Sequence, residues 1–242
     1  MCKVCGNPEH ELNGRRQFLR RTLAGVAALT LTRAYAEQAP AGVAAPNAIA
    51  PKVALQRLLD GNARYVSAAP VCGDSRDTRA ALVNGQYPIA AVLGCADSRV
   101  APELAFDQGP GDLFVTRVAG NVVADELLAS LEYGVQFLGL PLVMVLGHSG
   151  CGAVSAAIKV IKDGAQLPGH LPALIEAIKP AVRAVNDTPP AGLLDAAIAA
   201  NVQRQVGLLK TESAILGEYF KAGKIDIVGA VYALDTGKVT LL

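Results

Sequence analysis

Two short segments of the sequence carry side chains that could hold a metal ion together. Cys95 stands in Gly-Cys-Ala-Asp-Ser-Arg, and His148 is followed three residues later by Cys151. Two thiolates and one imidazole form a borderline-soft ligand set that suits Zn²⁺. Three protein ligands leave the fourth position of a tetrahedral site open, which is typical of catalytic zinc. The sequence therefore predicts one zinc ion per chain, bound by Cys95, His148 and Cys151.

Each segment directly follows an apolar run that has the length of a buried strand. The two runs cover residues 89–93 and 142–146. In parallel α/β sheets, functional side chains gather at the carboxyl ends of the strands. If the two strands are neighbours, the three ligands can converge on one ion. Cys151 also precedes a helical stretch, and the positive end of a helix favours a thiolate.

The rest of the chain alternates between short apolar runs and helical stretches. Two more buried strands are expected at 113–115 and 225–231, and an edge strand at 238–242. Helices are expected at 52–66, 123–139, 152–163, 171–185 and 193–222. This alternation predicts an α/β fold with a mostly parallel central β-sheet flanked by helices. We expect a single catalytic domain over 52–242, preceded by an Ala/Pro-rich linker or arm over 37–51.

Composition narrows the class of protein. Hydrophobic residues make up 52% of the 242 residues, which is enough to fill a core and excludes wholesale disorder. The 22 basic and 21 acidic side chains leave a net charge of +1. A near-neutral chain offers no electrostatic basis for nucleic-acid binding. We therefore expect no nucleic-acid partner.

The first 36 residues contain the parts of an export signal in their usual order. Paired Arg15 and Arg16 precede an apolar run at 22–32, which is shorter than the roughly 20 residues of a membrane span. Ala34-Tyr-Ala36 then forms a small-x-small cleavage site. The pattern predicts a twin-arginine-type signal peptide that the export machinery recognises, with no stable membrane anchor. The protein would be exported, into the periplasm if its source has two membranes.

The reactive segments also resemble those of a known family. Cys95-x-Asp-Ser-Arg together with His148-x-x-Cys-Gly resembles the β-class carbonic anhydrases, and the similarity extends over roughly residues 51–242. The resemblance implies a zinc enzyme that interconverts CO₂ and bicarbonate, with Cys95, His148 and Cys151 as the metal ligands. In that family, hydroxide bound to zinc attacks CO₂. The resemblance further implies a homodimer or tetramer.

The resemblance assigns roles to further residues. Asp97 and Arg99 would be the catalytic pair, in which the carboxylate accepts the hydrogen of the hydroxide. Arg99 would keep this carboxylate ionised through charge-assisted hydrogen bonds. In some members the Asp occupies the fourth zinc position instead, and the sequence leaves both states open. Four residues would line the substrate pocket, some of them across a dimer interface: Gln86, Phe114, Tyr133 and Gly152.

Three alternatives stay open at the level of sequence. The same scaffold supports hydrolysis of CS₂ or COS, which resemble CO₂ in shape. A zinc-binding module without turnover is a second reading, although it would not need the Asp97–Arg99 pair. A thiol-dependent hydrolase, with Cys95 or Cys151 as nucleophile and His148 as base, is a third. Cys72 has no assigned role and could pair between subunits or stay free.

Overall fold

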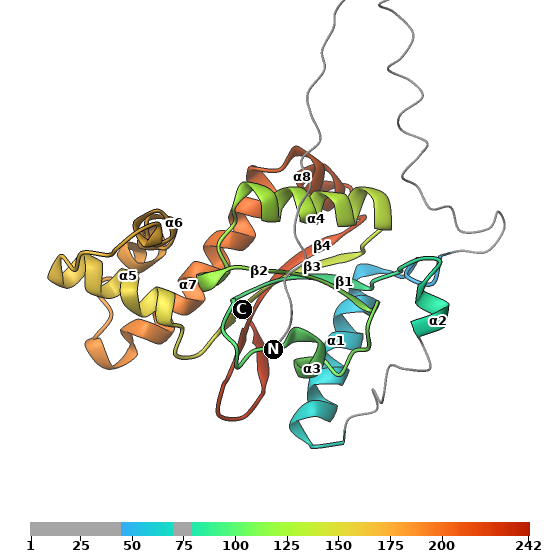
Figure 1. Ribbon diagram of the computed structural model, residues 1–242, viewed down its shortest axis with the longest axis horizontal. Helices are drawn as coiled ribbons and strands as arrows, with labels where there is room; N and C mark the ends of the chain where they lie inside the picture. The colour runs from blue at the N-terminus through green and yellow to red at the C-terminus, as the bar shows by residue number, and fades with distance from the viewer. Residues whose placement is uncertain (1–44, 70–78) are drawn as a thin grey trace, which may run out of the picture. The chain divides into compact units, whose positions relative to one another are not determined.

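A five-stranded sheet forms the centre of the part of the chain that the computed structural model describes, residues 45–69 and 79–242 (Figure 1). The predicted signal peptide and Cys72 lie outside these described residues. The strands are β1 (Ala90–Gly94), β2 (Leu113–Arg117), β3 (Leu142–His148), β4 (Asp226–Tyr232) and β5 (Val239–Leu241). The five correspond to the five apolar runs of the sequence.

The strand order is β2-β1-β3-β4-β5. The first four strands are parallel, and β5 is antiparallel to β4 at the edge. β1 lies beside β3, with Gly94 level with Leu146. The two strands that precede the candidate zinc ligands are therefore neighbours, as the predicted convergence of those ligands requires.

Helices cover both faces of the sheet. Figure 1 shows α1 and α3 on one face and α4 and α8 on the other. The longer helices are α1 (Pro51–Val66), α4 (Asp125–Leu138), α5 (Gly152–Asp163), α6 (Leu171–Ala184), α7 (Pro190–Thr211) and α8 (Ala214–Lys221). Short turns of helix, absent from the predictions, form α2 (Arg79–Leu82), α3 (Pro102–Ala105) and the 3₁₀ segment η2 (Ala119–Asn121). No helix within the described ranges combines the length and hydropathy needed to cross a membrane.

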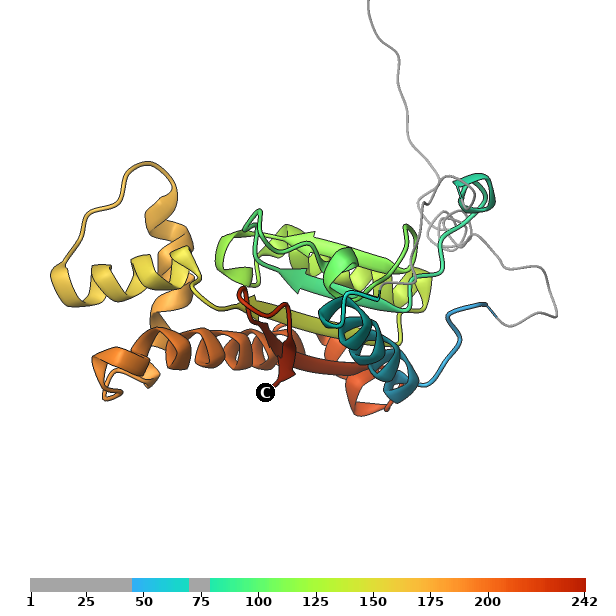
Figure 2. The same cartoon turned by 90° about the horizontal axis from the view of Figure 1, so that it is seen from below.

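The central strands are buried on both faces, which explains their unbroken apolar runs. Because successive side chains of a strand point to opposite faces, Ala90 and Val92 pack on the α1 side. Ala91 and Leu93 pack on the side of α4, α7 and α8. A third apolar cluster joins α5, α6 and α7, which in Figure 2 extend beyond the end of the sheet. Cys95 and Cys151 belong to this third cluster.

Two residues from the end of the predicted 37–51 segment pack against the domain. Asn47 is 2% exposed and donates hydrogen bonds to the carbonyl oxygens of Pro88 and Leu138, at 3.1 and 2.7 Å. Ile49 packs against the core on the α1 side. Asn47 thus anchors the segment before α1 to the residues that precede β1 and to the last residue of α4.

The prediction of one helix over 193–222 is wrong, because the chain breaks after Thr211 and starts a new helix at Ala214. Ser213 is the reason. Its backbone is extended, with φ −102° and ψ 115°, and its hydroxyl accepts a hydrogen bond from the N–H of Leu216. A serine in this position satisfies a free N–H group of the new helix and so favours a helix start.

Replacing this cap should destabilise the fold measurably. In Ser213→Ala, α8 loses its cap and Glu132 loses the 2.6 Å hydrogen bond from the Ser213 hydroxyl. We expect a loss of about 1–2 kcal/mol in the free energy of unfolding, measured by denaturant titration. Ser130→Ala is the matched control, because the Ser130 hydroxyl is exposed and bonds only its own helix. Equal losses in the two variants would contradict the role of the cap.

Candidate metal centre

The three predicted ligands come together at the carboxyl end of the sheet. Cys95 directly follows β1, His148 is the last residue of β3, and Cys151 is the residue that precedes α5. Their ligand atoms all lie within 4.8 Å of one another. The residues are 4%, 0% and 1% exposed, respectively. The predicted cluster is confirmed, and its ligand atoms are close enough to one another to bind one ion.

The imidazole of His148 is oriented as a ligand. Its Nδ1 lies 2.9 Å from the carbonyl oxygen of Ser149. Because a carbonyl oxygen only accepts, Nδ1 carries the hydrogen, and Nε2 keeps its lone pair in the neutral ring. Nε2 is buried and has no hydrogen-bond partner among the residues that the structure describes. A buried, unsatisfied nitrogen is costly, and a metal ion shared with the two sulfur atoms would satisfy it.

The two thiols interact directly. Hydrogen bonding with the Cys151 thiol lowers the pKa of Cys95, and burial opposes this shift. The same hydrogen bond raises the pKa of Cys151 above its ordinary value. Cys95 is therefore the more acidic of the two thiols, and both sulfur atoms lose their protons when they bind a metal. The donor set fits Zn²⁺.

Asp97 and Arg99 form a two-pronged ion pair beside the cluster. Arg99 Nε donates to Asp97 Oδ1 at 2.9 Å, and Arg99 Nη2 donates to Oδ2 at 2.7 Å. The backbone N–H of Arg99 adds a third bond to Oδ1. These hydrogen bonds hold the pKa of the Asp97 carboxyl well below its usual range. Asp97 is a carboxylate at neutral pH, and it can only accept hydrogen bonds.

The Asp97 carboxylate approaches the metal position without joining the ligand set. Its Oδ2 lies 3.8 Å from Nε2 of His148. The group of mutually close ligand atoms contains Cys95, His148 and Cys151, and Asp97 is not a member. Both carboxylate oxygens are bonded to Arg99 instead. Three protein ligands and a nearby carboxylate match the composition of an open catalytic site.

Arg117 holds the segment that carries both the first ligand and the carboxylate, a function that the sequence did not reveal. It is the last residue of β2. Its Nε donates to the carbonyl oxygen of Cys95 at 2.8 Å, and its Nη2 donates to those of Asp97 and Val100 at 2.6 and 2.8 Å. A single guanidinium therefore fixes three carbonyl groups of one loop.

The predicted pocket residues are spread over the chain. Gln86 is exposed and lies between α2 and β1. Phe114 lies in β2 level with Ala91 and packs on the α4 side of the sheet. Tyr133 is 39% exposed on α4. Gly152 begins α5, directly after Cys151. Of the four, Gly152 alone adjoins a metal ligand in sequence, and the pocket roles of all four stay predictions.

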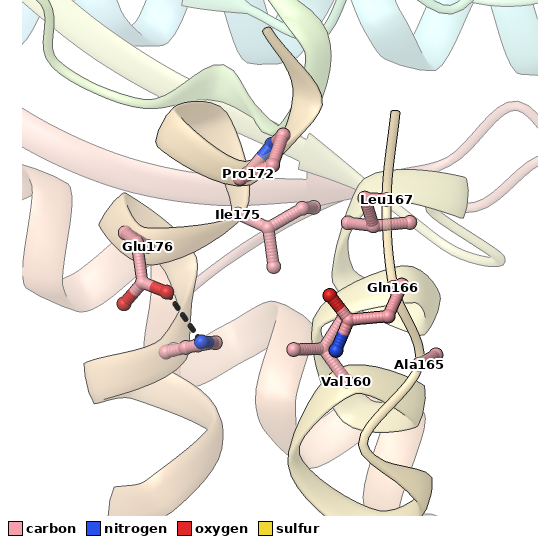
Figure 3. Close-up of a pocket in the computed structure, with 8 residues that line it drawn as sticks. Val160, Ala165, Gln166, Leu167, Pro172, Ile175 and Glu176 are labelled. Atoms are coloured by element: carbon pink, nitrogen blue, oxygen red, sulfur yellow. Dashed lines mark hydrogen bonds and ion pairs between the residues drawn. The ribbon is translucent and has the colours of Figure 1, made fainter. Parts of the chain in front are cut away.

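A groove of about 170 Å³ lies away from these residues, between α5 and α6 (Figure 3). Val160 and Ile175 give it apolar walls, and an ion pair joins Glu176 to Lys179 at its rim. None of the predicted ligands or pocket residues lines it. The groove is therefore separate from the metal centre.

Comparison with known proteins agrees with the geometry. The sequence profile of the carbonic anhydrase family matches residues 90–239. The chain belongs to the carbonic anhydrase family. It is 41% identical over 192 residues to carbonic anhydrase 2 of Mycobacterium tuberculosis, a match that covers 79% of this chain and 92% of the relative. The matched region contains the whole Cys-His-Cys cluster.

Solved structures identify the class. The β-carbonic anhydrase CcaA is 28% identical, with a TM-score of 0.62 over 77% of this chain and 94% of that chain. The Coccomyxa β-carbonic anhydrase, solved with acetazolamide, is also 28% identical, with a TM-score of 0.58 over 78% and 86% of the two chains. The α/β fold is confirmed, as is the resemblance to the β class. This carbonic anhydrase uses one zinc ion at Cys95, His148 and Cys151 for the reversible hydration of CO₂.

Proposed function

We propose that Asp97 and Arg99 are the catalytic pair of this reaction and that the site works in its open state. The observation that carries the proposal is the doubly hydrogen-bonded Asp97–Arg99 pair, with Oδ2 3.8 Å from the buried Nε2 of His148. A carboxylate in that place accepts a hydrogen bond from a donor beside the metal position. It thereby sets the direction of the donor's remaining lone pairs.

Arg99 contributes through Asp97. Its guanidinium keeps the carboxylate ionised and fixes its orientation, so the acceptor is ready before substrate arrives. Zinc in this site would lower the pKa of a water molecule to about 7, and carbonic anhydrase is the reference case for that value. His148 and the two cysteines hold the metal, and their burial excludes bulk water from the ligand side.

The preferred substrate is CO₂ rather than CS₂ or COS. This part of the proposal rests on the relatives that are named carbonic anhydrases. Hydration of CO₂ and hydrolysis of CS₂ and COS should be measured on one zinc-loaded sample. We expect CO₂ to have the highest kcat/KM by at least tenfold, which corresponds to about 1.4 kcal/mol. A higher kcat/KM for CS₂ or COS would reverse the assignment.

Gly152 offers a test of the space beside the ligands. A Cβ atom built on Gly152 meets no other atom within 4 Å, so the fold does not require glycine there. We expect Gly152→Ala to keep the Tm of the wild type but to lower kcat/KM several-fold, because the methyl group enters space used by substrate. Gly207→Ala, in α7, is the control, since its Cβ also meets nothing. Equal activity in both variants and the wild type would remove Gly152 from the pocket.

The protein is at least a dimer. Two aromatic side chains, Tyr133 and Phe137, are exposed by 39% and 46% on α4, with ring centroids 5.3 Å apart. Exposed neighbouring aromatic rings favour burial against another surface. A second copy of this chain is the proposed partner, because the pocket residue Tyr133 would then serve the site of its neighbour.

Sedimentation velocity tests the dimer. The wild type should sediment as a dimer or larger species, and Phe137→Asp should shift it toward monomer and lower its activity. Val83→Asp is the control, because it changes another exposed apolar side chain, away from α4. We expect Val83→Asp to leave the assembly intact. A fully active wild-type monomer would exclude the proposed assembly.

Residues 1–36 act as the signal that directs export of the protein. The proposal rests on the order of Arg15-Arg16, the apolar run 22–32 and Ala34-Tyr-Ala36. In a bacterium with two membranes, the chain should appear in the periplasm with Glu37 as its first residue, as read by mass spectrometry. Replacing both Arg15 and Arg16 by Lys should retain it in the cytoplasm. Wild-type chain that stays cytoplasmic with residues 1–36 attached would contradict export.

A further inference from the structure

Two buried amide side chains lie on α7 behind the metal centre. Asn201 and Gln205 are each 1% exposed and stand one helical turn apart. Gln205 Nε2 donates to Asn201 Oδ1 at 3.1 Å, and Gln205 Oε1 accepts from the N–H of Val123 at 2.9 Å. Asn201 Nδ2 donates to the carbonyl oxygen of Gly120 at 2.8 Å. Buried amide groups are costly unless they are hydrogen-bonded, so the presence of two of them in one series of hydrogen bonds calls for an explanation.

This series of hydrogen bonds ends at a sulfur ligand of the metal. The N–H of Gly120 donates to Sγ of Cys95 at 3.3 Å. Gly120 has φ +75°, and a Cβ atom there would come within 2.6 Å of Ile178 Cδ1. Because the residue has neither a side chain nor a preferred backbone region to hold it, its orientation depends on its hydrogen bonds. The bond from Asn201 to its carbonyl group, together with the bond from the Asn121 N–H to the carbonyl oxygen of Val118, holds the peptide plane that follows Gly120 and so limits its rotation.

Close packing brings α7 into reach of Gly120. A Cβ atom on Gly147 of β3 would lie 2.6 Å from Val202 Cγ2, and one on Gly229 of β4 would lie 2.7 Å from Val202 Cγ1. The two glycines therefore let Val202 sink onto the sheet. Asn201, its neighbour in sequence, is held at a fixed distance from the metal centre by this contact.

We propose that Asn201 and Gln205 are positioning residues of the zinc site, which act by fixing the Gly120 N–H on the Cys95 sulfur. A hydrogen bond to a metal-bound sulfur reduces the electron density that the sulfur gives to the metal. It also holds the sulfur in the direction that the ion requires. The proposal rests on the zinc function of Cys95, and it concerns a contact between α7 and the ligand rather than a substrate contact.

Cobalt substitution tests the proposal through a signal that fold stability alone does not move. Sulfur-to-cobalt charge-transfer absorption reports the electron density of the ligand sulfur. We expect Asn201→Leu to shift this band to longer wavelength and to weaken zinc affinity by roughly 10–100-fold in competition with a chelator. The milder Gln205→Met, which leaves Asn201 in place, should shift the band in the same direction by less.

Asn62→Leu is the matched control. Asn62 is also buried, and it donates to the carbonyl oxygens of Ala105 and Gly237 and accepts from the N–H of Val239, each at 2.8 Å. It touches no metal ligand in these bonds, so we expect lower stability with an unchanged band and unchanged zinc affinity. If Asn201→Leu does not fold, Gln205→Met decides the question.

The possible outcomes distinguish a failure of the positioning role from a failure of the zinc site. A wild-type band position and zinc affinity in folded Asn201→Leu or Gln205→Met would overturn the positioning role and leave the zinc site standing. Absence of any charge-transfer band in the wild type would overturn the sulfur ligation on which both depend. A shift in both variants, and none in Asn62→Leu, is the result that we expect.

Discussion

Cys95→Ser should abolish zinc binding and with it the hydration of CO₂. Cys95 is 4% exposed, and its sulfur lies within 4.8 Å of the ligand atoms of His148 and Cys151. A serine hydroxyl is not ionised at neutral pH and is a poor zinc ligand, so two ligands would remain. We expect zinc content to fall from about one to below about 0.1 per chain, and kcat/KM to fall by roughly a thousandfold or more.

The control is Cys72→Ser, since Cys72 has no role in the proposed site. Zinc content by elemental analysis, stopped-flow hydration and circular dichroism should be measured on the same samples. Cys72→Ser should match the wild type in zinc and activity. Full zinc content in folded Cys95→Ser would show that the three-ligand assignment is wrong.

Asp97→Asn should leave zinc in place but slow the reaction strongly. The amide retains the shape of the carboxylate but offers only one acceptor oxygen and no charge, so its pairing with Arg99 and its orienting function fail together. We expect kcat/KM to fall by about 10²–10³-fold, the range for losing a positioned acid–base or charge-stabilising group. Zinc content should stay near one per chain, because Asp97 is outside the ligand set.

A double-mutant cycle with Arg99→Gln tests whether the two residues act as a unit. Because Arg99 acts through Asp97, the double variant should be little slower than Asp97→Asn alone. Asp163→Asn, at the exposed end of α5, is the control and should keep wild-type activity. Additive losses from the two single variants would contradict a role of Arg99 through Asp97.

The pH dependence follows from the same ion pair. Arg99 holds the pKa of the Asp97 carboxyl below its ordinary value, so the carboxylate form is fully present above the usual range of an aspartate and is lost only as pH falls through the depressed pKa. Changes in activity near neutral pH therefore come from other groups. In Asp97→Asn, the apparent pKa of activity near neutrality should remain visible at lower amplitude.

Much of the fold could be predicted because buried parallel strands are unbroken apolar runs. The apolar runs before Cys95 and His148 indicated where β1 and β3 end, and the reactive residues at those ends predicted the metal cluster. The break before Ala214 was missed because it falls in the polar stretch 210–213, which a single continuous helix could also place on its exposed face. Its signal is Ser213, whose capping hydroxyl is recognisable once a helix start is considered.

The supporting residues of the site depend on contacts that sequence spacing does not encode. Arg117 bonds carbonyl groups of a loop about twenty positions earlier in the chain, and Asn201 reaches a glycine 81 positions away. Both contacts follow from strand order and helix packing. The pocket roles of Gln86 and Tyr133 stay predictions, because the proposed pocket would be completed by a second copy of the chain.

The most direct test of the zinc-dependent activity is stopped-flow CO₂ hydration by the purified chain, with zinc content measured on the same sample. We expect about one zinc per chain and fast hydration of CO₂. Hydration should disappear when zinc is removed and return when zinc is restored. Folded protein that binds no zinc, or that binds zinc and does not hydrate CO₂, would contradict a zinc-dependent carbonic anhydrase activity.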